Sequence, residues 1–138
     1  MTSEFQKRFR TNPKLAEEGV WVDFGGGIRV KIARFSSKKS MGARRRLEKP
    51  YRGVSARTGN LPPDLAEKIT IEQMAEAIVL DWEGVSYREQ ENFPYSVENA
   101  LTILSDPEYA DFKDQCASVS LDAEPFRDPE NEEAARKN

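Results

Sequence analysis

An alternating segment built around three consecutive glycines, Gly25 to Gly27, constrains the fold of this chain more than any other feature. The apolar members of the alternation are Val20, Val22, Phe24, Ile28, Val30 and Ile32. A period of two is typical of half-buried strands, and glycine adopts the positive φ angles of tight turns without steric cost. Residues 19–35 are therefore predicted to form an antiparallel β-hairpin. A phosphate-binding loop is disfavoured, because such loops lead from a strand into a helix and here a second strand follows.

Downstream of this hairpin, the apolar residues follow helical spacing and are separated by capping residues and prolines. Helices are predicted at about residues 37–48, 63–83, 96–105 and 106–123. Because 138 residues suit one globular domain, we predict an α+β fold, a mostly α-helical single domain with an N-terminal antiparallel β-hairpin. The predicted parts are a flexible N-terminal arm, 1–18, a folded domain, 19–124, and a flexible C-terminal tail, 125–138.

The strongest helical pattern covers residues 63–83. Pro63 and Asp64 are typical of a first helical turn, and a broad apolar face then continues at i, i+3 and i+4 spacing as far as Trp82. Gly84 is predicted to end this helix. Since Trp82 continues the apolar stripe, packing in the core is favoured for it over contact with a partner.

Two scarce residue types exclude most catalytic chemistry. The chain has no histidine and a single cysteine, Cys116, so it lacks the commonest general base and zinc ligand and cannot form an internal disulfide. Cys116 lies on an apolar helix face and is expected to be a buried, unreactive thiol. No apolar stretch is long enough to span a bilayer, and no apolar block follows the basic N-terminus as in a secretory signal. We expect a cytoplasmic protein without enzymatic activity, cofactor, metal or membrane partner.

Charge is distributed unevenly along the chain. Residues 1–57 hold fifteen Lys and Arg against five acids, a net charge of +10, and residues 58–138 hold six against nineteen, a net charge of −13. The favoured interpretation is a basic front half folded against an acidic back half; the other is a basic surface for a polyanion or an acidic partner. The candidate basic patch consists of Lys38, Lys39, Arg44, Arg45, Arg46, Lys49 and Arg52.

Four groups of residues in a fixed order carry a resemblance to a known family. They are 19–22 (GVWV) with 28–34 (IRVKIAR), 45–52 (RRLEKPYR), 81–85 (DWEGV) and 94–100 (PYSVENA). In this order they resemble the tail assembly chaperones of siphophages, over residues 19 to about 127. The resemblance implies a protein of the host cytoplasm that binds the tape measure protein, helps to recruit the major tail protein and is absent from the mature virion. It implies no enzymatic activity, and it raises the expectation of a longer form made by ribosomal frameshifting.

The family offers no fixed binding residues to transfer, so the partner surface is assigned from the residues alone. Trp82, Phe93 and Tyr95 are the candidate partner-binding residues, because aromatic side chains often dominate interfaces. Two other functions stay open: a basic nucleic-acid-binding phage protein, which the absence of a recognisable DNA-reading motif disfavours, and a structural tail or head-tail component. The sequence does not fix the oligomeric state, and self-association stays open.

Overall fold

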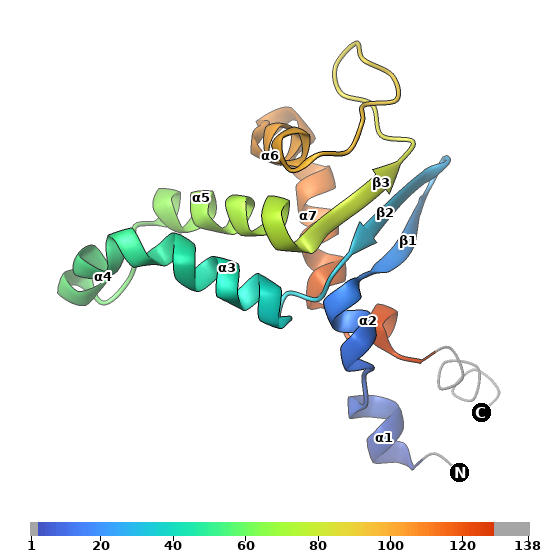
Figure 1. Ribbon diagram of the computed structural model, residues 1–138, viewed down its shortest axis with the longest axis horizontal. Coiled ribbons are helices and arrows are strands. Elements are labelled where there is room, and N and C mark those ends of the chain that lie inside the picture. Colours follow the sequence, from blue (N-terminus) through green and yellow to red (C-terminus); the bar gives the residue numbers. More distant parts are fainter. Residues whose placement is uncertain (1–2, 129–138) are drawn as a thin grey trace.

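The computed structural model describes residues 3–128 and has mixed α and β structure, as predicted (Figure 1). The α-helices are α1 (Glu4–Phe9), α2 (Pro13–Glu18), α3 (Lys38–Glu48), α4 (Arg52–Thr58), α5 (Pro63–Gln73), α6 (Val97–Ser105) and α7 (Ala110–Leu121). The strands are β1 (Val20–Gly25), β2 (Ile28–Ile32) and β3 (Val79–Glu83). Short helical turns are η1 (Lys49–Tyr51), η2 (Met74–Ile78), η3 (Pro107–Tyr109) and η4 (Glu124–Phe126), of which η2 is a π-helix. The helices predicted near 37–48, 96–105 and 106–123 are confirmed.

The predicted hairpin forms two strands of a three-stranded antiparallel sheet in the order β1-β2-β3. Val22 lies opposite Val30, and the turn is made by glycines with positive φ angles, as the alternation predicted. On the other side of β2, Val30 lies opposite Trp82 of β3. Because β2 is the central strand, its inward side chains Val30 and Ile32 are completely buried.

The prediction of one helix over residues 63–83 is wrong in its last part. The helix continues through η2 only to Ile78, and Val79–Glu83 form strand β3. A β-bulge explains the misleading pattern, because Val79 pairs with Ile32 and Asp81 with Lys31, which leaves Leu80 as an extra residue. The extra residue brings Val79 and Trp82, three positions apart, to the same face of a strand. Their spacing therefore imitates the period of a helix.

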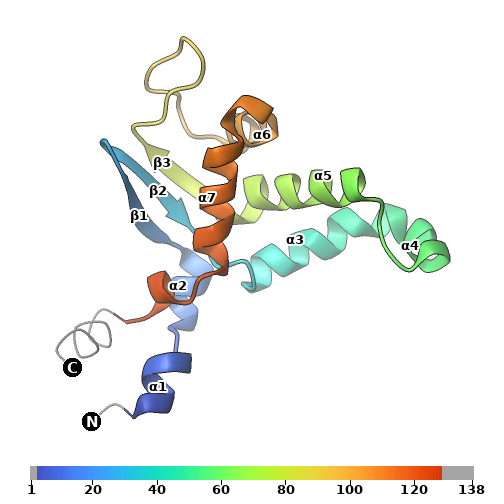
Figure 2. The ribbon, with the colours of Figure 1, turned by 180° about the vertical axis from the view of Figure 1, so that it is seen from behind.

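One face of the sheet carries the hydrophobic core. Helix α7 crosses this face (Figure 2), and α6 packs against α7 and η2. The buried cluster contains Val30, Ile32, Met74, Ala75, Ile78, Val79, Trp82, Val85, Phe93, Ala100, Ile103, Leu104 and Cys116. The opposite face exposes Trp21, with the Arg29 guanidinium 5.0 Å from the centre of its ring. The sheet is thus apolar on one side and charged on the other, as the alternation requires.

Helices α3 and α5 run antiparallel and project from the sheet, with α4 at the tip (Figure 1). Gln73 of α5 is completely buried, and its Nε2 donates to the Ser40 hydroxyl of α3 at 2.8 Å. Arg44 of α3 donates to Gln73 Oε1 at 3.0 Å and to the Thr70 hydroxyl at 3.1 Å. Buried polar groups are tolerated when they are hydrogen-bonded, and here they fix α3 on α5 in one register.

Both predicted flexible ends contribute to the fold. Residues 4–18 carry α1 and α2, and the Asn12 amide donates to the Phe126 carbonyl at 2.8 Å while its side chain donates to Asp128 at 2.6 Å. Phe126 is completely buried, and the Arg34 guanidinium lies 6.0 Å from its ring centre. The prediction that a flexible tail begins at residue 125 is therefore wrong for residues 125–128, which are held in the fold. Residues 1–2 and 129–138 lie outside the described part of the chain.

Candidate partner-binding groove

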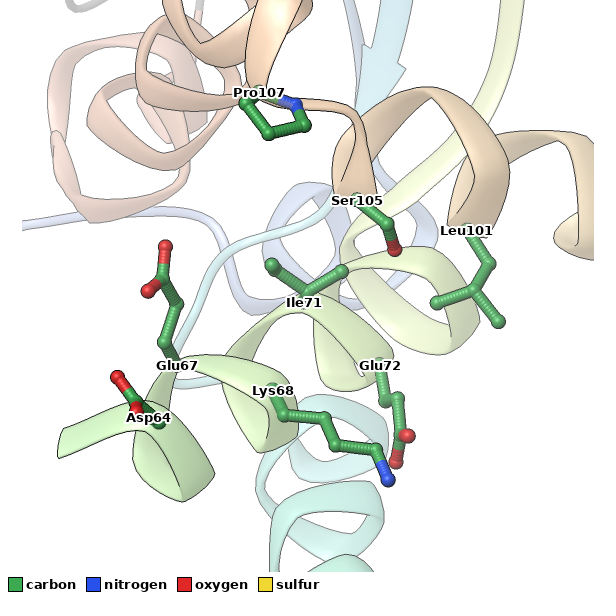
Figure 3. A pocket seen from close by; sticks show the side chains of 8 residues that line it. All are labelled: Asp64, Glu67, Lys68, Ile71, Glu72, Leu101, Ser105 and Pro107. Carbon is green, nitrogen blue, oxygen red and sulfur yellow. The ribbon is translucent and has the colours of Figure 1, made fainter. Parts of the chain in front are cut away.

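An open groove of about 460 Å³ lies between α5 and α6 (Figure 3). The lining residues are Asp64, Glu67, Lys68, Ile71, Glu72, Leu101, Ser105 and Pro107. They come from one side of α5, one side of α6 and the start of η3. The groove therefore joins two segments that are about thirty residues apart in sequence, each ordered by its own helix signals.

The floor of the groove is apolar because α6 carries apolar residues on two sides. Ser96 caps this helix by accepting from the Asn99 amide at 2.9 Å. Ile103 and Leu104 face the core and are buried, whereas Leu101, which is 38% exposed, faces α5. Ile71 of α5 lies beside it in the groove and is only partly buried. An apolar floor left open to water is typical of a surface that binds another chain.

The rim of the groove is acidic. Asp64, Glu67 and Glu72 carry three negative charges, and Lys68 is the only basic residue among those that line the groove. Lys113 of α7 reaches Glu67 at 3.0 Å and offsets part of this charge. With Lys68 and Lys113 counted against the three acids, one net negative charge remains, which favours a basic ligand over an acidic one for the apolar floor.

Of the three aromatic residues predicted to bind a partner, Trp82 and Phe93 are buried and Tyr95 is partly buried, and all three make contacts within the chain. Trp82 is 5% exposed, its indole N–H donates to the Phe93 carbonyl at 2.7 Å, and the two rings stack with centres 6.0 Å apart. Tyr95 is half-buried and its hydroxyl donates to the Val79 carbonyl at 2.9 Å, while burial raises its pKa. The partner-surface assignment is therefore corrected for Trp82 and Phe93, and the preferred core interpretation of Trp82 is confirmed.

The candidate basic patch is divided between two roles. Arg44 points into the α3–α5 interface and also pairs with Glu48 at 2.7 Å, and Arg46 pairs with Glu76. The others are exposed along α3 and its extension: Lys38, Lys39, Arg45, Lys49 and Arg52. Within residues 3–128, the charged groups of these five side chains form no ion pair, and the Glu17 carboxylate accepts a hydrogen bond from the Lys38 backbone amide at 2.8 Å. The basic segment thus partly folds against the acidic half and partly faces solvent.

A polar cluster that the sequence did not indicate holds the loop between β3 and α6. Tyr87 donates to Asp106 at 2.8 Å, Arg88 pairs with the same carboxylate at 2.6 Å, and the Arg88 amide donates to the Tyr109 hydroxyl at 2.7 Å. The Tyr87 hydrogen bond, followed by the Glu108 amide, lowers the pKa of Asp106. Its contribution to stability is therefore present above the ordinary carboxyl pKa and is lost as the pH falls through the lowered value. In the sequence, Asp106 followed by Pro107 indicates a helix start and gives no sign of this cluster.

Cys116 is completely buried in the core, and burial raises its pKa to about 12. At pH 8, iodoacetamide is expected to alkylate native protein at least about 100-fold more slowly than protein unfolded in urea, because only the thiolate reacts. Mass spectrometry over time measures both rates. The thiol stabilises the fold fully below its ordinary pKa of about 9, and this contribution is lost as the pH rises toward 12. Equal alkylation rates for native and urea-unfolded protein would contradict the burial of Cys116.

Across residues 3–128, no group of three or more His, Cys, Asp and Glu side chains is arranged to hold a metal ion. In the same span, no helix has the length and apolar character needed to cross a bilayer.

A family model described as YdaY prophage protein matches residues 35–137. The match begins just before α3 and includes every residue that lines the groove, whereas α1, α2, β1 and β2 precede it. No curated protein and no solved structure matches the chain.

Proposed function

The chain belongs to the YdaY prophage protein family and is thus phage-derived, and from this premise we propose that it is a tail assembly chaperone. In this proposal the groove between α5 and α6 binds an amphipathic helix of the tape measure protein. The observation that carries the proposal is an apolar floor, left uncovered and bordered along α5 by acidic residues. The ordered resemblance of four sequence groups to siphophage tail assembly chaperones supports it.

The chemistry of the groove suits the apolar face of an amphipathic helix. An amphipathic helix binds by inserting apolar side chains spaced three or four residues apart into such a groove. Leu101 and Ile71 provide the apolar contact, and Asp64, Glu67 and Glu72 select basic residues beside the apolar stripe of the ligand. Since the site is small and open, binding is expected to be reversible, as a transient assembly factor requires.

The protein acts in the bacterial host cytoplasm, helps to bring the major tail protein to the tape measure, and leaves before the particle is complete. It performs no catalysis. Analysis of purified phage tests the last step of the assembly, because a chaperone is absent from mature particles whereas a structural tail or head-tail component is present in stoichiometric amount.

Leu101→Glu is expected to weaken binding to the tape measure protein of the same phage by about 10- to 100-fold, because it removes an apolar contact and adds charge to the floor. Val97→Glu is the matched control. Val97 is another exposed apolar residue of α6, one turn away, and does not line the groove. Isothermal titration calorimetry measures the affinities, and thermal melts show that both variants are folded. Equal affinities for the two variants would show that the groove does not bind the tape measure protein.

Nucleic-acid binding is the second candidate, because five exposed basic residues follow α3 and its extension, namely Lys38, Lys39, Arg45, Lys49 and Arg52. Such binding weakens steeply with salt, since cations are released from the phosphates. Docking of an apolar helix changes far less. Titrating a DNA duplex and the tape measure protein at 50 and 300 mM salt therefore separates the two functions.

A further inference from the structure

We infer that α1 of one copy docks in the groove between α5 and α6 of a second copy, so that the free protein self-associates head to tail. This contact goes beyond the proposed function, because it needs no tape measure protein. It uses the same groove, and a tape measure helix would therefore have to displace α1.

Helix α1 has the composition of a ligand for this groove. A capping box between Ser3 and Gln6 starts the helix, which has no buried residue. Phe5 and Phe9 lie four positions apart on one side, with ring centres 5.1 Å apart, and they are 71% and 68% exposed. They are the two most exposed large apolar residues in the described part of the chain. A pair of aromatic rings left in water favours burial in a contact.

The charges of α1 complement those of the groove. Lys7, Arg8 and Arg10 accompany the two aromatic residues, and Arg8 pairs with Glu4, the only acid of the helix, at 3.1 Å, so that Lys7 and Arg10 carry the net positive charge. The groove offers Asp64, Glu67 and Glu72 around Leu101 and Ile71. Basic residues beside an aromatic pair therefore meet acidic residues beside an apolar floor. Complementary potentials of this kind select the partner and its orientation.

The contact must be made between two copies. Asn12, three residues after Phe9, is held by Phe126 and Asp128, and the Arg127 side chain donates to the Arg8 carbonyl. In both ribbon views α1 lies at one end of the molecule, well away from α6 (Figures 1 and 2). A helix tethered there does not reach the groove of its own chain. Because the two surfaces differ, each contact joins unlike surfaces, and copies assemble either into a closed ring, of which a reciprocal dimer is the smallest, or into an open chain.

Sedimentation velocity of the full chain between about 10 µM and 1 mM tests the inference, since an interface of this small size associates weakly. The wild-type mass is expected to rise with concentration. The double variant Phe5→Ser/Phe9→Ser is expected to remain monomeric over the same range, and its fold is unaffected because neither side chain is buried. Leu121→Ser is the matched control, since Leu121 is 65% exposed but lies on α7 outside the groove.

Charge reversal identifies the two surfaces. Lys7→Glu/Arg10→Glu and Asp64→Lys/Glu72→Lys are each expected to weaken self-association by at least about tenfold, and mixing the two variants is expected to restore a mixed complex. A wild-type protein that stays monomeric at 1 mM, or a Phe5→Ser/Phe9→Ser variant that associates like the wild type, overturns the inference. Binding of the tape measure protein is measured separately. If only this binding fails, the proposed function is wrong and the self-association stands.

Discussion

Trp82→Ala is expected to lower the free energy of unfolding by about 3–5 kcal/mol, the usual cost of truncating a large buried aromatic side chain. The indole fills the space between β3, the loop that contains Phe93, and α7, and it makes edge contacts with Tyr95 at 5.1 Å and Phe112 at 6.4 Å between ring centres. Its N–H also holds the Phe93 carbonyl, which loses this partner in the variant. Urea unfolding followed by circular dichroism measures the change.

Trp21→Ala provides a control with the same change of side chain. Trp21 lies on the exposed face of the sheet, is 37% exposed, and contacts Arg29 through a cation–π interaction. Its removal is expected to cost about 1 kcal/mol or less. If the two variants lost equal stability, the assignment of Trp82 to the core would be wrong.

Gly84→Ala is expected to cost at least about 3 kcal/mol, because two effects add at this position. Gly84 has a φ of +73°, a left-handed conformation that an L-residue adopts only with strain. A Cβ atom there would also lie 2.3 Å from the Gly27 carbonyl oxygen. This collision would be between the added Cβ and a backbone atom at the end of the β2–β3 pair, so no side-chain rotation relieves it. Urea unfolding midpoints measure the loss.

Gly59→Ala separates strain from collision. Gly59 follows α4 with a φ of +80°, and a Cβ atom would meet no atom within 4 Å. Its substitution is expected to cost about 1–2 kcal/mol, the left-handed strain alone. If Gly84→Ala were no less stable than Gly59→Ala, the backbone at the end of the β2–β3 pair would have to move to admit the methyl group. This end of the sheet would then be easily deformed.

The two charged surfaces of the molecule have different origins. The acidic rim of the groove is carried by α5, and the exposed basic residues by α3 and its extension, although these helices pack against each other. Arg44 and Arg46 provide the basic side of that packing, through Gln73, Thr70 and Glu76. Of these contacts, Arg46–Glu76 alone neutralises opposite charges of the two chain halves, because Arg44 bonds the uncharged Gln73 and Thr70 and pairs with Glu48 of its own helix.

The sequence predicted those elements whose patterns are local. The hairpin over 19–35 needed only alternation and a glycine turn, and α6 needed only a capping serine and helical spacing. Strand β3 was missed because a bulge at Leu80 gives a strand the spacing of a helix, and a bulge depends on the partner strand β2. Phe126 was assigned to a tail because the residues that bury it lie far away in the chain.

For the groove, the sequence determined the acidic first turn of α5 and the apolar residues on two sides of α6. For the inferred self-association, it determined the basic aromatic segment at residues 5–10. Only the tertiary structure decided which of them meet. Leu101 is identical in character to Leu104, yet the docking of α6 leaves the first open beside Ile71 and encloses the second. The same docking places Trp82 inside. The charge and polarity of a side chain are properties of the residue itself. Its exposure to solvent depends on contacts between segments far apart in the chain, and no local sequence pattern encodes which segments meet.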